Sequence, residues 1–323
     1  CGIVSQNSWL FLKSFDRARN WFLENYTFEK IINLGSGAFQ DLSGEKSNVS
    51  LIIFSQSKFR SNIIDICNIQ GETYSEKMLY LNSNLTFVHK LQSSINKLTG
   101  FDFTEKNLLD ELNNATDVYS SVAIPMQGTS TGNSKELVGF FWEHFGDTNW
   151  ISVSKGGGYC RWQGLNNSVV KWGNDGEYIK QQKGSALRNT KHFTNTEMVF
   201  SDTGTAGLNV RMLQNNQIFI ASGPGIRITQ GNKYAHLALL NSRFASYCIR
   251  LMSPKLTIAA GYIGQIPINK EICTSVVLEK NARLCVKLKK QILSLRTTNS
   301  EYDDTFIAML PSDIDKAAWY LFN

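Results

Sequence analysis

The stretch that decides the fold is residues 28–56, FEKIINLGSGAFQDLSGEKSNVSLIIFSQ. Residues 31–34 and 49–54 are rich in β-branched and aliphatic side chains and are bounded by Gly, Ser and Asn, which predicts two buried strands. Three glycines lie between them: Gly35, Gly37 and Gly44. Glycine allows sharp turns and a close approach of the backbone to a ligand, and loops at strand ends are where open α/β sheets bind. The aromatic residue of this loop, Phe39, is the first candidate for a site residue.

The segment upstream extends the pattern. Residues 2–4 are expected to form a strand that leads into residues 5–9 (SQNSW), and residues 16–26 carry apolar side chains at helical spacing. The order strand, helix, strand, glycine loop, strand resembles the distal half of the catalytic domain of DNA adenine-N6 methyltransferases of the gamma motif order. In that family an LGxxxF loop follows the helix, and here residues 34–39 read LGSGAF.

Further short motifs extend the resemblance to large type II restriction-modification methylases and PglX-like phage-exclusion methylases. They are residues 127–133 (QGTSTGN), 155–159 (KGGGY), 172–176 (WGNDG), 240–242 (LNS) and 261–268 (GYIGQIPI). The last two are similar to the closing part of target-recognition domains. The resemblance implies an α/β fold: the C-terminal part of a Rossmann-like methyltransferase sheet, then a mixed α/β target-recognition domain and a long helix.

The resemblance also implies the chemistry of the parent protein. Such an enzyme transfers a methyl group from S-adenosylmethionine to an adenine that is turned out of the DNA duplex. The family uses a glycine-rich loop for S-adenosylmethionine and an Asn/Asp-Pro-Pro-Tyr/Phe motif for the adenine amino group. Neither occurs here, and the Asn/Asp-Pro-Pro-Tyr/Phe motif is excluded because no two of the five prolines are adjacent. We therefore expect no catalytic residue and no bound S-adenosylmethionine in this chain, which should be inactive without the remaining N-terminal half of the parent.

Phe39 has two interpretations. By the resemblance, it stacks on the extruded adenine. A flipped base loses a few kcal/mol of stacking and pairing, which an aromatic ring replaces in part, at roughly 1–3 kcal/mol per base. In the alternative, Phe39 fills a hole beneath the loop as part of the core.

Positive charge is concentrated in one part of the chain. The net charge is +6, and residues 151–235 hold ten basic and four acidic residues, so this segment carries the whole excess. Such a concentration suits a polyanion, because each neutralised phosphate releases counterions. A solvated basic face is the alternative.

The same segment supplies candidates for contacts with double-stranded DNA. Residues 155–162 combine flexible backbone, cations and aromatic surface, a mixture that can contact phosphates, sugars and bases. The candidate base readers are Arg161, Arg188, Arg211 and Arg227. The candidate phosphate contacts are Lys155, Lys171, Lys183 and Lys191. Further DNA-binding candidates are Thr129, Thr131, Tyr159 and Trp162. A hairpin in which Trp162 and Trp172 pack inward is the alternative.

Apolar spacing suggests where the domains divide. Residues at intervals of three and four predict an amphipathic helix over 84–98, and 108–112 and 118–122 are expected to continue a helical connection. This gives a domain of residues 1–125, the distal part of the catalytic domain with its connection, and one of residues 126–323, the target-recognition domain. A single core shared by both halves is the alternative.

The other predicted elements are a buried strand at 140–142, strands at 218–221 and 226–228 joined by a turn, a helix over 236–249 and a long helix over 270–295. His236 is expected to be structural. The basic cluster at residues 287–290 is expected to be solvated, with contact to the DNA backbone as the alternative.

Composition limits the class of protein. A chain of 323 residues with 42% hydrophobic residues can bury the cores of two domains. It has no run of about eighteen apolar residues and no signal peptide, so no membrane partner is expected. Six scattered cysteines without a CxxC pair indicate reduced thiols in the cytoplasm and no metal site. Residue 1 is Cys and the sequence opens on a strand, which suggests a piece of a longer protein.

Two other classes fit parts of the sequence. A nonenzymatic specificity subunit of a type I system also ends its recognition domain with an LNS-type helix and a long helix, but it lacks the methyltransferase sheet that residues 28–56 indicate. A protein-interaction scaffold would bind a peptide through the Trp-rich segment. Its binding to nucleic acid would be absent or would depend only weakly on salt.

Overall fold

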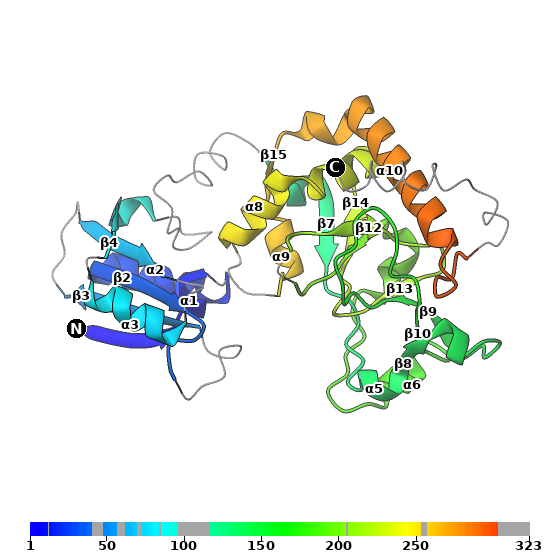
Figure 1. The fold of residues 1–323 in the computed structure, drawn as a ribbon, viewed down its shortest axis with the longest axis horizontal. Helices are drawn as coiled ribbons and strands as arrows, with labels where there is room; N and C mark the ends of the chain where they lie inside the picture. Colours follow the sequence, from blue (N-terminus) through cyan, green and yellow to red (C-terminus); the bar gives the residue numbers. More distant parts are fainter. Residues whose placement is uncertain are drawn as a thin grey trace. The chain divides into compact units, whose positions relative to one another are not determined.

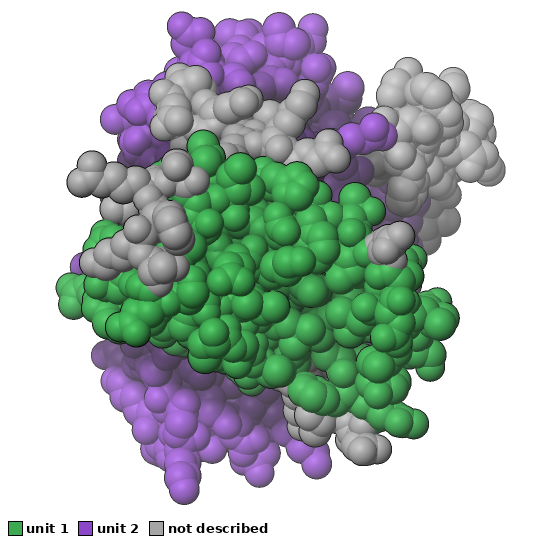
Figure 2. All heavy atoms as spheres, turned by 90° about the vertical axis from the view of Figure 1, so that its left-hand side faces the viewer, with its two compact units in different colours: residues 1–112 green, residues 113–323 purple. Residues whose placement is uncertain are grey.

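The computed structural model describes residues 1–11, 13–40, 48–56, 62–69, 73–83, 85–95, 117–204, 206–252 and 257–302. The chain divides into two compact units, residues 1–112 and 113–323, which Figure 2 colours separately. Each unit has its own sheets and buried apolar side chains.

The first unit is built on a five-stranded sheet with the order β1-β3-β2-β4-β5 (Figure 1). Its strands are β1 (Gly2–Gln6), β2 (Thr27–Gly35), β3 (Val49–Ser55), β4 (Ile63–Asn68) and β5 (Val88–Leu91). β3 is antiparallel to both β1 and β2, and β2 is parallel to β4, so β1, β2 and β4 run in the same direction. The strands predicted at residues 31–34 and 49–54 are confirmed as parts of β2 and β3.

Helices cover both faces of this sheet. α1 (Ser8–Phe11), the 3-10 turn η1 (Lys13–Phe15) and α2 (Asp16–Asn25) follow β1, and α3 (Tyr74–Asn82) follows β4. Ile31 lies in the core cluster that contains Leu10 and that Phe22 of α2 packs against, whereas Ile32 packs with Leu81 of α3. Because neighbouring residues of a strand point to opposite faces, the two helical segments cover opposite sides. The predicted α/β class is confirmed.

The helix predicted over residues 84–98 is wrong for its described part. That part contains β5, which pairs with β4, and the 3-10 turn η2 (Gln92–Ser94). Its apolar residues serve different faces, since Leu85 packs with the α3 side of the sheet and Ile95 lies in the other core cluster. The spacing of three and four therefore reflects two separate contacts. Residues 84, 96–98 and 108–112 lie outside the described residues.

The second unit contains two four-stranded sheets and a strand pair among its described residues. The order β13-β9-β10-β8 joins β8 (Val138–Phe140), β9 (Trp150–Ser154), β10 (Ser168–Lys171) and β13 (Ile218–Phe219). The order β12-β11-β14-β7 joins β7 (Ala123–Met126), β11 (Met198–Phe200), β12 (Val210–Met212) and β14 (Gly225–Ile228). The pair consists of β6 (Asp117–Val118) and β15 (Pro267–Ile268).

β6 and β7 thus belong to the second unit, whereas the sequence places them in the first domain up to residue 125. The strands predicted at residues 218–221 and 226–228 are confirmed, the first over two residues.

Two local predictions for this unit are wrong. Residues 119–121 form a single 3-10 turn, η3 (Tyr119–Ser121), and not a helical connection. Residues 140–142 are no buried strand, because β8 is an edge strand that ends at Phe140 and the 3-10 turn η4 (Phe141–Glu143) follows. The rings of Phe140 and Trp142 are exposed and stack on each other with centroids 4.6 Å apart.

The helices of the second unit are α5 (Ser134–Leu137), α6 (Glu177–Lys180), α7 (Lys233–Leu240), α8 (Arg243–Met252), α9 (Ala260–Ile263) and α10 (Val276–Ser294), with 3-10 turns η5 (Thr190–Asn195) and η6 (Lys270–Thr274) (Figure 1). The single helix expected over 236–249 is two helices, α7 and α8. Asn241 ends the first, since its side chain accepts from the backbone N–H of Val210 at 2.9 Å and donates to the carbonyl of Val210 at 2.9 Å. The Ser242 hydroxyl then accepts from the Ala245 N–H at 3.1 Å and starts the second.

The long C-terminal helix begins later than predicted. η6 precedes α10, and the hydroxyl of Ser275 caps its first turn by accepting from the Leu278 N–H. The apolar stripe also differs, because Val277 and Leu284 are exposed, whereas Ala282, Val286 and Leu293 are buried. Within the described residues no helix is long and apolar enough to cross a membrane.

His236 is a buried structural residue, as expected. Its Nδ1 lies 3.0 Å from the hydroxyl of Tyr119 and its Nε2 lies 2.8 Å from the carbonyl of Gln230. Burial lowers its pKa. The neighbouring Tyr119 is also buried, and desolvation, with smaller contributions from Cys273 and Glu197, raises its pKa well above 10.

The buried imidazole predicts a pH-dependent stability. The unfolded chain binds the proton of His236 more tightly than the folded chain does. The contribution of His236 to the free energy of unfolding should therefore be fully present above a pH of about 6.5 and should be lost as the pH falls below it. Urea unfolding at pH 7.5 and 5.5 measures this loss. His236→Gln should reduce the difference between the two pH values, and an unchanged difference would contradict the assignment.

Candidate nucleic-acid interface

The first candidate site lies at one edge of the five-stranded sheet. Because β1, β2 and β4 run in the same direction, their carboxyl ends meet there, and open α/β sheets bind ligands at such edges. The glycine loop leaves from the end of β2. Gly35 and Gly37 have φ values of +66° and +73°, a left-handed conformation that side chains other than glycine adopt only with strain.

Phe39 is exposed on this loop. Ala38 packs against the apolar cluster of Leu34, Val49, Cys67 and Ile69, which fixes the base of the loop. The next side chain, Phe39, retains 44% of its accessible surface. The ring of Phe39 is therefore not buried in the apolar clusters of the described residues.

A buried lysine holds the same edge. Lys77 of α3 is buried, and its Nζ donates to the carbonyls of Leu34 at 2.7 Å and Ile69 at 2.9 Å. These are the carbonyls at the ends of β2 and β4. α3 is itself started by a capping box between Thr73 and Glu76. No sequence motif marks Lys77, because a lysine on a short helix with a weak apolar stripe is indistinguishable from a solvated one.

In the second unit, three glycine-containing segments meet backbone to backbone. A Cβ on Gly128 would lie 2.3 Å from the carbonyl of Ile220, and one on Gly156 would lie 2.0 Å from the carbonyl oxygen of Ser222. Only glycine permits these contacts. The motifs at residues 127–133 and 155–159 are thus neighbours in space, and their glycines serve the packing of the two sheets.

Exposed cations surround this junction. Lys183 lines a pocket of about 360 Å³ together with Ser130, Ser134 and Ser222. Lys155 adjoins it, because its carbonyl accepts a hydrogen bond from the Ser222 hydroxyl. Arg188 also adjoins it, because its backbone N–H donates to the hydroxyl of Thr129 at 3.3 Å. We call the three exposed cations Lys155, Lys183 and Arg188 the junction cations.

Three of the candidate DNA contacts, Thr129, Thr131 and Arg211, are buried inside the fold, so their prediction as DNA contacts is wrong. The hydroxyl of Thr129 bonds the backbone of Arg188, and that of Thr131 lies 2.8 Å from the Ser134 hydroxyl. Arg211 is 1% exposed and donates to the hydroxyls of Ser201 at 3.2 Å and Ser154 at 3.0 Å. Burial lowers the pKa of Arg211 to about 10. From the sequence, the arginine of a strand is expected to be exposed. Only the arrangement of the strands in the structure shows that Arg211 is enclosed.

The aromatic loop that follows β9 is partly open. Tyr159 is exposed, and the guanidinium carbon of Arg161 lies 5.9 Å from its ring centroid. Trp162 is half-buried with φ of +72°, and its backbone pairs with Val210 and Met212. Trp172 packs inward against the core, with its ring centroid 5.7 Å from that of Phe193. The loop therefore offers Tyr159 and Arg161 to a ligand.

The remaining candidates are spread over the unit. Lys191 is exposed on η5, and Arg227 is half-buried on β14, an inner strand of its sheet. Lys171 is half-buried, with its ammonium 4.5 Å from the ring centroid of Tyr178. These three side chains do not gather with the junction cations through any contact in the described residues.

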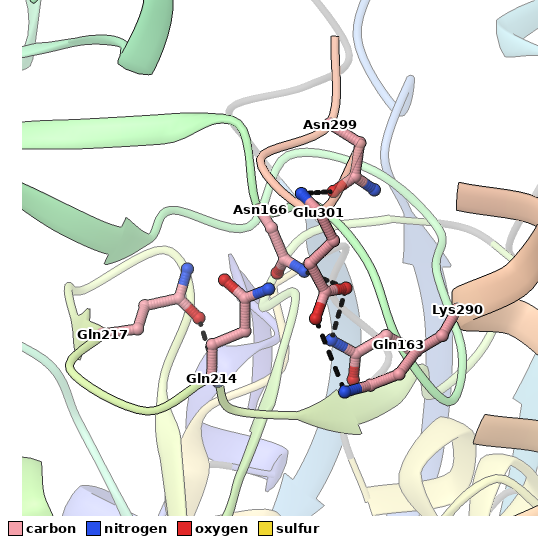
Figure 3. A network of polar contacts seen from close by, with 7 residues as sticks. All are labelled: Gln163, Asn166, Gln214, Gln217, Lys290, Asn299 and Glu301. Atoms are coloured by element: carbon pink, nitrogen blue, oxygen red, sulfur yellow. Dashed lines mark hydrogen bonds and ion pairs between the residues drawn. The ribbon is translucent and has the colours of Figure 1, made fainter. Parts of the chain in front are cut away.

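A polar network beside α10 has no counterpart in the sequence interpretation (Figure 3). The Glu301 carboxylate accepts from Gln163 at 3.2 Å and Asn166 at 3.5 Å, and it pairs with Lys290 at 3.5 Å. Gln163, Lys290 and Glu301 border a pocket of about 480 Å³. Their separation in sequence hides the network, whose contacts tie the segment after α10 to the sheets.

The fold is shared with solved restriction-modification enzymes. The structure is similar to the type IIL restriction-modification enzyme MmeI in complex with DNA (TM-score 0.51, 13% identity, 99% of this chain and 45% of that chain). It is also similar to a nuclease-deletion mutant of the type ISP restriction-modification enzyme LlaGI in complex with a DNA substrate mimic (TM-score 0.53, 11% identity, 89% of this chain and 35% of that chain). The chain therefore has a fold found in restriction-modification enzymes. No protein-family model matches it.

Sequence comparison is more specific. The chain is 24% identical over 282 residues to the adenine-specific methyltransferase BrxX of Escherichia coli O9:H4 (strain HS), covering 83% of this chain and 23% of BrxX. It is 22% identical over 307 residues to the adenine-specific methyltransferase PglX of Lacticaseibacillus casei (strain Zhang), covering 85% of this chain and 26% of PglX. It is thus a homologue of part of the adenine-specific methyltransferases, and it spans about a quarter of the length of these relatives. The resemblance found in the sequence is confirmed.

Proposed function

We propose that this chain is the part of a site-specific DNA adenine-N6 methyltransferase that recognises DNA and positions the target adenine, in a restriction-modification or phage-defence system. The observation that carries the proposal is the exposed Phe39 at the carboxyl edge of the sheet. Its ring provides a stacking surface for a base turned out of the duplex, which replaces roughly 1–3 kcal/mol of the lost stacking.

The second unit supplies the grip on the duplex. The junction cations and Tyr159 are exposed, Arg161 is half-buried beside the Tyr159 ring, and the glycine contacts hold the loops after β7 and β9 in place. Arginine can read guanine by paired hydrogen bonds in the major groove, and lysine neutralises phosphates. We assign base reading to Arg161 and Arg188 and phosphate contacts to Lys155 and Lys183. Lys171, Lys191 and Arg227 remain candidates for further contacts.

The first unit is proposed to be the C-terminal part of a Rossmann-like methyltransferase sheet. β1 pairs only with β3 among the described residues, and Val4 on it is 61% exposed. An exposed edge strand is a template for another strand. Beside it, Trp9, Phe22 and Phe28 line an apolar pocket of about 200 Å³. The partner we propose for this edge is the N-terminal half of the parent methyltransferase.

S-adenosylmethionine would be held by that other half. The chemistry of the described side chains does not fit the cofactor, because the family's glycine loop and Asn/Asp-Pro-Pro-Tyr/Phe motif are both absent from the sequence. We assign no residue of this chain to S-adenosylmethionine and no step of methyl transfer to it. The six free cysteines agree with the cytoplasmic location that we propose.

Binding of the chain to a random pool of short DNA duplexes over a salt series, with sequencing of what stays bound, tests the DNA-recognition role. The proposal predicts salt-dependent binding that enriches one motif. Binding that is insensitive to salt, or no binding, would contradict it and favour a protein-interaction scaffold. A type I specificity subunit would also enrich a motif, but methylation by its complex should not respond to Phe39→Ala.

A further inference from the structure

We infer that a ladder of three asparagines, Asn7, Asn33 and Asn68, positions the glycine loop so that Phe39 meets the adenine in a fixed orientation. The inference rests on the proposed function, because it deepens the role of the loop that carries Phe39. None of the three residues would touch the base. They act through the loop as positioning residues.

The ladder runs across the carboxyl ends of the three strands that share one direction. Asn7 follows β1, Asn33 is near the end of β2, and Asn68 ends β4. The amide nitrogen of Asn7 donates to Oδ1 of Asn33 at 2.9 Å, and the amide nitrogen of Asn33 donates to Oδ1 of Asn68 at 3.1 Å. Asn7 and Asn33 are 2% and 1% exposed, so their amides are enclosed in the fold.

Asn7 holds both stems of the loop at once. Its side chain bonds Asn33, two residues before the left-handed Gly35, and its backbone N–H donates to the carbonyl of Asn48 at 2.8 Å, directly before β3. Lys77 fixes the residue between the ladder and the loop, because it donates to the carbonyl of Leu34. The ends of the loop therefore cannot shift without breaking these hydrogen bonds.

Stability alone does not account for the ladder. Oδ1 of Asn7 is buried and has no hydrogen-bond partner among the described residues. A buried acceptor without a partner is unfavourable, whereas apolar side chains of the same shape would be neutral or stabilising at such a position. The amides instead fix orientation, because each hydrogen bond sets the orientation of the next asparagine side chain in the ladder. Sites that must be held to within a fraction of an ångström depend on supporting contacts of this kind.

The test uses the complete methyltransferase with two duplexes: unmodified DNA for the methylation kinetics and, for fluorescence, the same DNA with 2-aminopurine in place of the target adenine. In Asn33→Leu, we expect kcat to fall on the order of 10- to 100-fold, with KM for DNA within about twofold, because the reacting base is misplaced while the grip on DNA is intact. The flipped 2-aminopurine should also become more accessible to quenching by acrylamide. Asn68→Ala, at the exposed end of the ladder, should give a smaller change in the same direction and serves if Asn33→Leu does not fold.

A matched control lies at the opposite end of β2. The side chain of Asn62 donates to the carbonyl of Phe28 and, at 3.2 Å, to Oε1 of Gln92. Asn62→Leu removes hydrogen bonds from the same strand, away from the loop, and should leave kcat and the quenching unchanged. Equal effects in the Asn62 and ladder variants, or a normal kcat and quenching in both ladder variants, would overturn the inference.

Phe39→Ala distinguishes a failure of the positioning role of the ladder from a failure of the proposed function. If it changes kcat and quenching while the ladder variants do not, only the positioning role fails, and if it changes neither, the proposed function fails with it.

Discussion

Phe39→Ala should lower kcat/KM for methylation by the complete enzyme roughly 5- to 150-fold. This range corresponds to the loss of about 1–3 kcal/mol of stacking on the extruded adenine, at about 1.4 kcal/mol per tenfold in rate. Because the ring is exposed, the free energy of unfolding should change by no more than about 0.5 kcal/mol. Steady-state kinetics and urea unfolding measure the two quantities.

Phe39→Tyr is the matched control, because it keeps an aromatic ring on the same loop. It should retain most of the activity that Phe39→Ala loses. If both variants lose activity equally, or if Phe39→Ala destabilises the fold as much as it slows methylation, stacking is not the role of this residue.

The second large effect concerns the junction cations. Replacing Lys155, Lys183 and Arg188 together by Ala should weaken binding to duplex DNA on the order of 100-fold near 0.15 M salt. It should also reduce the slope of log K against log salt by about 1.8, since the phosphate contacts assigned to Lys155 and Lys183 contribute about 0.9 each, whereas Arg188 is assigned to a base. Fluorescence anisotropy with a labelled duplex at four or more salt concentrations gives both numbers.

The control keeps the change in net charge and moves it elsewhere. Lys280, Lys287 and Arg296 are exposed residues on and directly after α10. Their triple replacement by Ala should leave the salt slope nearly unchanged, because we assign no phosphate to them. Equal losses in both triple variants would mean that the excess charge acts only as a diffuse field, and that the junction is not the contact surface.

The sequence predicts β2 and β3 of the first sheet because their signals are local. Two β-branched runs around a glycine loop define β2 and β3, and the loop conformation follows from Gly35 and Gly37. The position of Phe39 on that loop is equally local. Spacing fails at residues 85–95, where apolar residues belong to two faces of the sheet and the backbone gains its hydrogen bonds from β4.

The site in the second unit is predicted less well, because it depends on pairing between distant strands. Arg211 is a candidate base reader in the sequence, yet its guanidinium bonds Ser154 and Ser201 inside the fold. The glycines of residues 127–133 and 155–159 are visible as motifs, but their shared role in packing against residues 220–223 appears only in three dimensions. The asparagine ladder is likewise hidden, since nothing in the composition distinguishes Asn7, Asn33 and Asn68 from the asparagines of turns.

The central claim is that the second unit selects the DNA sequence while the first presents the adenine. An exchange of the second unit, residues 113–323, for the matching segment of the homologue BrxX in the complete methyltransferase tests it most directly, with sequencing of the N6-methyladenine sites in genomic DNA. The account predicts that the methylated motif changes to that of BrxX and that Phe39→Ala still suppresses methylation at the new motif. A methylated motif that stays with the rest of the enzyme would contradict it.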